Sequence, residues 1–109
     1  MDAPAEAVER RTKMTHKLKL NEAFADAVLS GNKSFEIRRN DRGFQKGDFI
    51  TFQVVTGPAE LPVYVYHELN RRAYKITYVL SGWGLQEGYV ALGIKEIDWS
   101  DLPTIEGGS

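Results

Sequence analysis

Cysteine is absent from this chain of 109 residues, and histidine occurs only twice. The lack of cysteine excludes disulfide bonds, thiolate nucleophiles, iron–sulfur clusters and cysteine zinc sites. With only two histidines we expect no catalytic metal, and nothing indicates a cofactor. No apolar run approaches the ~20 residues that a membrane-spanning helix needs. The first residues also lack the basic start and apolar core of a signal peptide. We therefore expect no membrane association and a cytoplasmic protein.

The net charge of −1 argues against a wholly basic protein that coats DNA. The charge is unevenly distributed, however. Between residues 31 and 47 five basic residues face only two acidic ones, which gives this segment a charge of +3. The basic residues of the segment are Lys33, Arg38, Arg39, Arg42 and Lys46.

Hydrophobic periodicity predicts one early helix and about five strands with short links. Asn21 is a good helix N-cap and Gly31 a typical helix terminator, so the helix lies between them. Strands are expected at 16–20, 35–38, 49–55, 74–80 and 89–97, and the segment 63–66 is a weaker candidate for a further strand. Such strands must close on themselves or leave adhesive edges. We predict an α+β fold, a small mixed β-barrel with one main helix packed across it.

One domain fits this chain length. We expect the folded domain to cover residues 14–99, with flexible tails at 1–13 and 100–109, because both ends are polar and offer no packing face.

The segment from Gly31 to Arg42 concentrates polar chemistry around two large apolar side chains, Phe35 and Ile37. These two alternate with polar residues, as in a half-buried strand. Glu36 and Arg38 then share the opposite face, ~7 Å apart along the strand. We favour a binding cleft here for a ligand with phosphates and hydrogen-bonding edges. The alternative is a solvated strand edge with an exposed Glu36–Arg38 pair, worth at most ~1 kcal/mol.

Three further residues are candidates for a site. His16 precedes the helix and has the side chain whose ordinary pKa suits acid–base chemistry, although a structural histidine is the commoner case. Lys33 lies just after the helix, where a phosphate contact, a nucleophile or base, and a solvated lysine are all open. Trp83, between two glycines, is suited to stacking on a base or to capping a barrel end.

Gly31, Lys33, Glu36 and Arg38 match the four fixed positions of Gly-x-Lys-x-x-Glu-x-Arg. With the order of elements over residues 15–97, this pattern resembles the ASCH domain of the PUA-like superfamily, in a bacterial and phage branch of small uncharacterised proteins. The resemblance implies a small β-barrel that binds RNA in a cleft between helix and barrel. One ASCH-type branch is an amidohydrolase of acetylated cytidine. Lys33 matches its lysine, but Glu36 stands where that branch has a threonine.

Our leading hypothesis is a binding module for RNA, or for a nucleoside or nucleotide ligand. Its candidate contact residues are Lys33, Glu36, Arg38, Arg39, Asn40, Arg42 and Trp83. A second hypothesis is a hydrolase of a modified nucleoside, with Lys33 as nucleophile or base, Glu36 carrying protons and His16 assisting. A third is a phage-related protein-interaction module that uses a strand edge or the Trp83 loop, so a protein partner is also open.

Overall fold

The computed structural model describes residues 12–103 of the chain. Most of the expected tails at 1–13 and 100–109 therefore lie outside the described residues. Of the second expected tail, residues 100 and 101 take part in a short 3-10 helix, η2 (Trp99–Asp101). No helix among the described residues has the length and apolar composition needed to cross a membrane.

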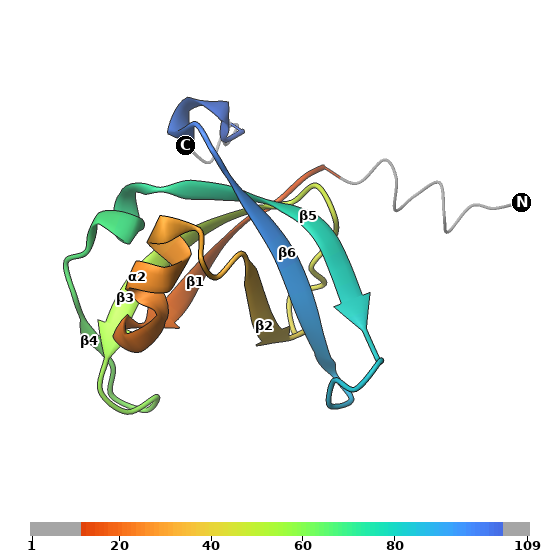
Figure 1. Ribbon diagram of the computed structural model, residues 1–109, viewed down its shortest axis with the longest axis horizontal. Coiled ribbons are helices and arrows are strands. Elements are labelled where there is room, and N and C mark those ends of the chain that lie inside the picture. The colour runs from red at the N-terminus through yellow and green to blue at the C-terminus, as the bar shows by residue number, and fades with distance from the viewer. Residues whose placement is uncertain (1–11, 104–109) are drawn as a thin grey trace, which may run out of the picture.

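Within residues 12–103 the fold contains six strands and one α-helix, so the prediction of an α+β fold is confirmed (Figure 1). A second 3-10 helix precedes the fifth strand. The elements are β1 (Thr15–Asn21), α2 (Glu22–Ser30), β2 (Phe35–Arg39), β3 (Phe49–Thr56), β4 (Val63–Tyr64), η1 (Glu68–Arg71), β5 (Ala73–Ser81) and β6 (Tyr89–Ile97).

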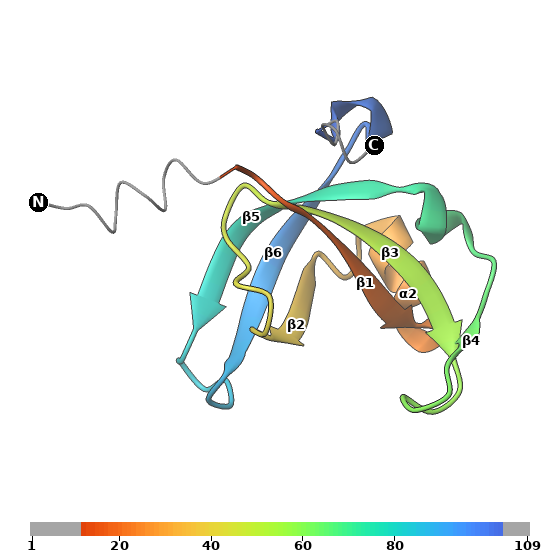
Figure 2. The ribbon, with the colours of Figure 1, turned by 180° about the vertical axis from the view of Figure 1, so that it is seen from behind.

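The strands form one mixed sheet in the order β1-β3-β5-β6-β2, with β4 attached to β3. β1 and β3 are parallel, and all other pairs are antiparallel. β3 pairs with β5 only over Phe49–Thr51, after which the two strands diverge and the sheet opens into two wings (Figures 1 and 2). β1 and β2 end the path and do not pair with each other, so the predicted closure into a barrel is wrong.

The first strand and the helix follow directly from local sequence. His16, Leu18 and Leu20 alternate with exposed residues and point into the core. The Asn21 side chain then accepts a hydrogen bond from the Ala23 N–H at 2.8 Å, which caps α2. Gly31 ends the helix in the left-handed conformation, with φ of 88°. This turn sends the chain directly into the polar segment that becomes β2.

Asp48 is the most buried charged residue of the core, with no exposed surface. It is the last residue of the β2–β3 loop, and its side chain contacts the start of β1. Its carboxylate accepts hydrogen bonds from the Met14 N–H at 3.2 Å, the Gln45 N–H at 3.1 Å and, at 2.9 Å, from His16 Nε2. The His16 ring also packs edge-on against Phe44, with centroids 4.7 Å apart. Asp48 therefore fixes the start of β1 against the turn that precedes β3.

We predict that Asp48→Ala lowers the free energy of unfolding by about 3 kcal/mol, because it leaves the buried His16 and two partly buried N–H groups without their acceptor. Urea denaturation measures this loss. Asp41→Ala removes an exposed carboxylate from the same loop and should change stability by less than ~0.5 kcal/mol. Equal stability of the two variants would show that the Asp48 contacts do not stabilise the fold.

Tyr74 is buried on β5 against Phe52, and its hydroxyl has no hydrogen-bond partner among residues 12–103. Burial, assisted by the nearby Glu96 carboxylate, raises the pKa of this phenol from 10.0 to about 12. The folded protein therefore keeps the neutral phenol at a pH where the unfolded chain already ionises. Stability that depends on Tyr74 is complete below pH 10 and declines between pH 10 and about 12.

We predict that Tyr74→Phe raises the free energy of unfolding by about 1 kcal/mol at neutral pH, because an unpaired buried hydroxyl is removed. The difference between Tyr74→Phe and the parent should then widen as the pH rises above 10. Urea denaturation of both proteins at pH 7 and pH 10.5 measures the two differences. A variant less stable than the parent at both pH values would show that the hydroxyl has a partner.

Candidate phosphate-binding site

A hollow of about 380 Å³ lies beside β1, β3 and β4 on the side where β2 approaches β1. We call it the basic hollow. It is lined by Lys17, Lys19, Arg38, Arg42, Gln53 and Tyr64. Lys17 and Lys19 occupy the exposed positions of β1, because the alternating positions of that strand face the core. Four cationic side chains thus surround one concave surface, and no carboxylate of the described residues lines it.

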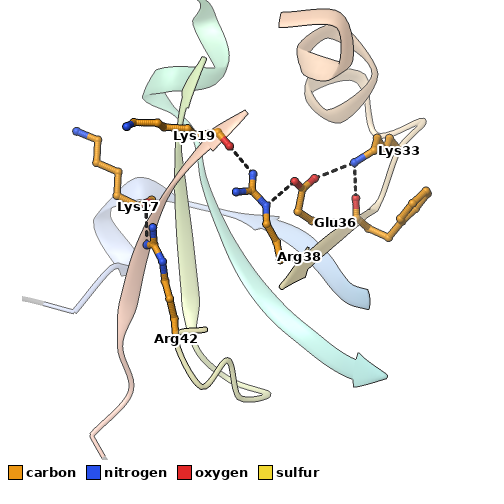
Figure 3. Close-up of polar contacts among 7 residues, drawn as sticks. Lys17, Lys19, Lys33, Glu36, Arg38 and Arg42 are labelled. Atoms are coloured by element: carbon orange, nitrogen blue, oxygen red, sulfur yellow. Dashed lines mark hydrogen bonds and ion pairs between the residues drawn. The ribbon is translucent and has the colours of Figure 1, made fainter. Parts of the chain in front are cut away.

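Glu36 organises the polar side of β2 and is itself only 4% exposed. Its Oε1 accepts a hydrogen bond from Lys33 Nζ at 2.8 Å, and its Oε2 accepts one from Arg38 Nε at 2.8 Å (Figure 3). Lys33 Nζ also donates to the Phe35 carbonyl at 3.0 Å and lies 4.9 Å from the centre of the Phe35 ring. The buried carboxylate is therefore satisfied on both oxygens and fixes the direction of Arg38.

Arg38 and Arg42 both reach the free edge of β1, where alternate carbonyl groups point away from β3. Arg38 Nη2 donates to the Lys19 carbonyl, and Arg42 Nη1 donates to the Lys17 carbonyl at 2.9 Å (Figure 3). These two bonds join β2 and the segment after it to β1 without any backbone ladder between the two strands. We call this side-chain junction the seam. The basic hollow lies along it.

The cations of the basic hollow retain capacity for an anion. A guanidinium group has five N–H donors, and the seam uses only part of that set. Within residues 12–103, Lys17, Lys19 and Arg42 form no ion pair with a carboxylate. Lys19 Nζ lies 5.9 Å from the centre of the Tyr64 ring, so charge and an exposed aromatic ring meet at the same place.

The sequence correctly places Glu36 and Arg38 on one face of a strand, but the direction of that face is the reverse of the expectation. Glu36 points inward, whereas Phe35 and Ile37 are 45% and 49% exposed. The inward face of β2 is polar because it meets Lys33 and the unpaired edge of β1, where hydrogen bonds are available. Alternation alone does not reveal such partners.

Other predicted contact residues lie elsewhere. Arg39 points to the opposite face, with its guanidinium 5.5 Å from the centre of the Tyr89 ring. Asn40 accepts a hydrogen bond from the Phe44 N–H at 3.0 Å and so shapes the β2–β3 loop. Trp83 is 90% exposed in the loop between β5 and β6. None of these three lines the basic hollow.

The residues of the hydrolase hypothesis are only partly brought together. Lys33 and Glu36 are in direct contact, but His16 is bound to Asp48. Lys33 Nζ donates to both a carboxylate and a carbonyl, and such an ammonium group is a poor nucleophile. Among residues 12–103 no group of three or more His, Cys, Asp or Glu side chains is placed to hold a metal ion.

Sequence reasoning missed four of the six lining residues of the basic hollow, namely Lys17, Lys19, Gln53 and Tyr64. The strand pattern does reveal that Lys17 and Lys19 point outward. It does not reveal that β1 lies next to the segment carrying Arg38 and Arg42, because this contact joins positions 19 and 25 residues apart.

The comparisons with known proteins give a family but no activity. Residues 15–94 match the family described as a domain of unknown function, DUF3850. The match covers well over half of the chain, so the chain belongs to this family. No curated protein matches it.

We predict that Glu36→Ala lowers the free energy of unfolding by about 2 kcal/mol, because two partly buried cations lose their carboxylate. Glu36→Gln retains the carbonyl acceptor and should lose less. The exposed Glu87→Ala is the control, with an expected change below ~0.5 kcal/mol. Urea denaturation gives the free energies, and the exchange rate of the Arg38 Nε proton by NMR reports whether that side chain is released. An unchanged exchange rate in Glu36→Ala would contradict the role of Glu36 in holding Arg38.

Proposed function

We propose that this chain is a nucleic-acid-binding module of the PUA-like class, related to the ASCH domain, which binds single-stranded RNA or an RNA-derived nucleotide in the basic hollow. Three features support the class. The fold is a mixed, strongly curved sheet with one helix, the helix follows the first strand, and the Gly31-x-Lys33-x-x-Glu36-x-Arg38 segment comes directly after it. The open seam between β1 and β2 replaces the last ladder of a closed barrel.

The observation that carries the function is the composition of the basic hollow. Lys17, Lys19, Arg38 and Arg42 surround it without a lining carboxylate in the described chain. Arginine offers paired N–H donors that match two phosphate oxygens, and lysine adds mobile point charges. Arg38 is held in place by Glu36, so this donor is already oriented before a ligand arrives. A phosphate group therefore fits the hollow better than a neutral ligand.

The two remaining lining residues favour a nucleotide over an isolated phosphate ion. Tyr64 exposes most of its ring at the hollow, which suits stacking against an unpaired base. The Gln53 side-chain oxygen offers an acceptor for a base edge, while its Nε2 donates to the Val54 carbonyl at 3.1 Å and the Val65 carbonyl at 3.5 Å. Unpaired RNA presents phosphates, flat bases and hydrogen-bonding edges together.

We predict that a fluorescein-labelled single-stranded RNA of twelve nucleotides binds with an affinity that falls as salt is added. The four cations of the basic hollow should contribute about −3 to the slope of log K against log salt. Lys17→Ala/Lys19→Ala should lower the affinity at least tenfold and make the slope shallower by about 1.4, because two contacts are lost. Fluorescence anisotropy between 50 and 300 mM salt measures both quantities.

Arg71→Ala is the matched control, because Arg71 is an exposed cation of η1 that does not line the basic hollow. It should leave affinity and slope nearly unchanged. An affinity that does not change with salt concentration would contradict a phosphate site at the basic hollow. An equal loss of affinity in Arg71→Ala and in Lys17→Ala/Lys19→Ala would also contradict it.

A further inference from the structure

The wing formed by β5, β6 and β2 carries large, solvent-facing side chains on its outer face, on both sides of the small residues Ala91 and Gly93 of β6. On β6, Val90, Leu92 and Ile94 point into the core, so Ala91 and Gly93 lie on the opposite face. In the ladder, Gly93 has Phe35 of β2 on one side and Tyr78 of β5 on the other. Ala91 lies in the same way between Ile37 and Leu80. We call these six residues the outer aromatic face.

A bulge in β5 puts Tyr78 on this face. The register shifts between Ile76 and Tyr78, so Thr77 is an extra residue and both Thr77 and Tyr78 are exposed while Ile76 stays buried. Gly93 leaves room opposite the bulge, since a Cβ atom there would lie in a tight contact, 3.0 Å from Thr77 Oγ1. A bulge of this kind redirects one side chain, and here it leaves Tyr78 61% exposed.

A second basic surface adjoins the Thr77 end of this face. A hollow of about 690 Å³ is lined there by Lys13, Lys46, Lys75 and Lys95, together with Gly47, Ile76, Thr77 and Ile97. We call it the lysine hollow. Lys75 and Lys95 are directly opposite each other across β5 and β6. None of the four lysines forms an ion pair with a carboxylate of residues 12–103.

Like charges in such a cross-strand pair destabilise a sheet, and a bound anion relieves the repulsion. Thr77 lines the lysine hollow and also forms the bulge that exposes Tyr78, so the cations and the aromatic ring are neighbours. A purely apolar protein partner would leave the four lysines uncompensated. A ligand that alternates negative charge with flat apolar groups satisfies both surfaces, and single-stranded nucleic acid has this character.

The β2–β3 loop connects this region to the basic hollow. Arg42 lines the basic hollow and Lys46 lines the lysine hollow, four positions apart in this loop. Their Cα atoms are therefore no more than about 14 Å apart. Both hollows lie within reach of one ligand of several nucleotides.

We propose that the lysine hollow and the outer aromatic face form a second contact surface for single-stranded nucleic acid, with phosphates at the lysines and bases against Phe35 and Tyr78. This inference rests on the proposed function and specifies its ligand. The natural ligand is then an extended strand of several nucleotides, and a mononucleotide occupies the basic hollow alone.

The test compares the dinucleotide pUpU with a labelled twelve-nucleotide oligouridine on four proteins. The proteins are the parent, Lys75→Ala/Lys95→Ala, Tyr78→Leu and Lys17→Ala/Lys19→Ala. We expect each of the two variants of the second surface to bind the twelve-nucleotide strand about tenfold more weakly while binding pUpU as the parent does. The salt slope for the long strand should become shallower by about 1.4 in Lys75→Ala/Lys95→Ala. Tyr66→Leu, which removes an exposed tyrosine outside the outer aromatic face, is the control for loss of a ring.

The outcomes separate the two proposals. If the second-surface variants bind the long strand like the parent, the second surface is overturned and the basic hollow stands. If only the second-surface variants lose affinity and Lys17→Ala/Lys19→Ala does not, the basic hollow is overturned and the second surface stands. If the parent binds neither ligand, both are overturned. All substituted side chains are exposed, and thermal unfolding of each variant confirms that the fold is intact.

Discussion

The buried carboxylate of Glu36 is the interaction on which the arrangement of the seam depends. It lies at the centre of a line of polar groups that runs from Lys33, at the exit of α2, through Arg38 to the backbone of β1. A carboxylate in this position is costly to desolvate, and two charged donors offset that cost. Because Glu36 holds both Lys33 and Arg38, and Arg38 also donates to a β1 carbonyl group, the helix exit, β2 and β1 are linked through three side chains in sequence. The basic hollow lies along this linkage.

The seam also deals with a general difficulty of sheets, the exposed strand edge. β1 and β2 are the two ends of the strand path, and each presents peptide groups that another chain could pair with. Arg38 and Arg42 occupy two of the carbonyl groups on the β1 edge and leave positive charge along it. Charged side chains at an edge discourage pairing with a second sheet. The same charges that protect the edge also line the basic hollow, so edge protection and the proposed phosphate binding involve the same residues.

Local sequence determines much of this fold. The alternation in β1, the Asn21 cap and the Gly31 terminator place the first strand and helix correctly, and the α+β class follows from them and from the later strand patterns. The pairing of Glu36 with Arg38 is also predictable from the sequence, because residues two positions apart in a strand lie on the same face. The sequence does not predict contacts between residues that lie far apart along the chain. The inward direction of the polar face of β2 depends on the β1 edge, and the role of Asp48 depends on a histidine 32 positions away. The lack of closure depends on the short pairing of β3 with β5.

A junction made of side chains differs from a ladder in what can change it. Backbone hydrogen bonds persist through most substitutions, so a closed barrel keeps its dimensions as its sequence drifts. The junction between β1 and β2 consists instead of the guanidinium groups of two arginines, and a single substitution removes either one. Exchange of Arg42 for a shorter or uncharged residue would alter the width and polarity of the opening without touching the core, whereas exchange of Arg38 would also leave one oxygen of the buried Glu36 carboxylate without its donor. A single substitution at position 42 can therefore change the polarity and width of this opening without any change to the backbone ladders of the sheet.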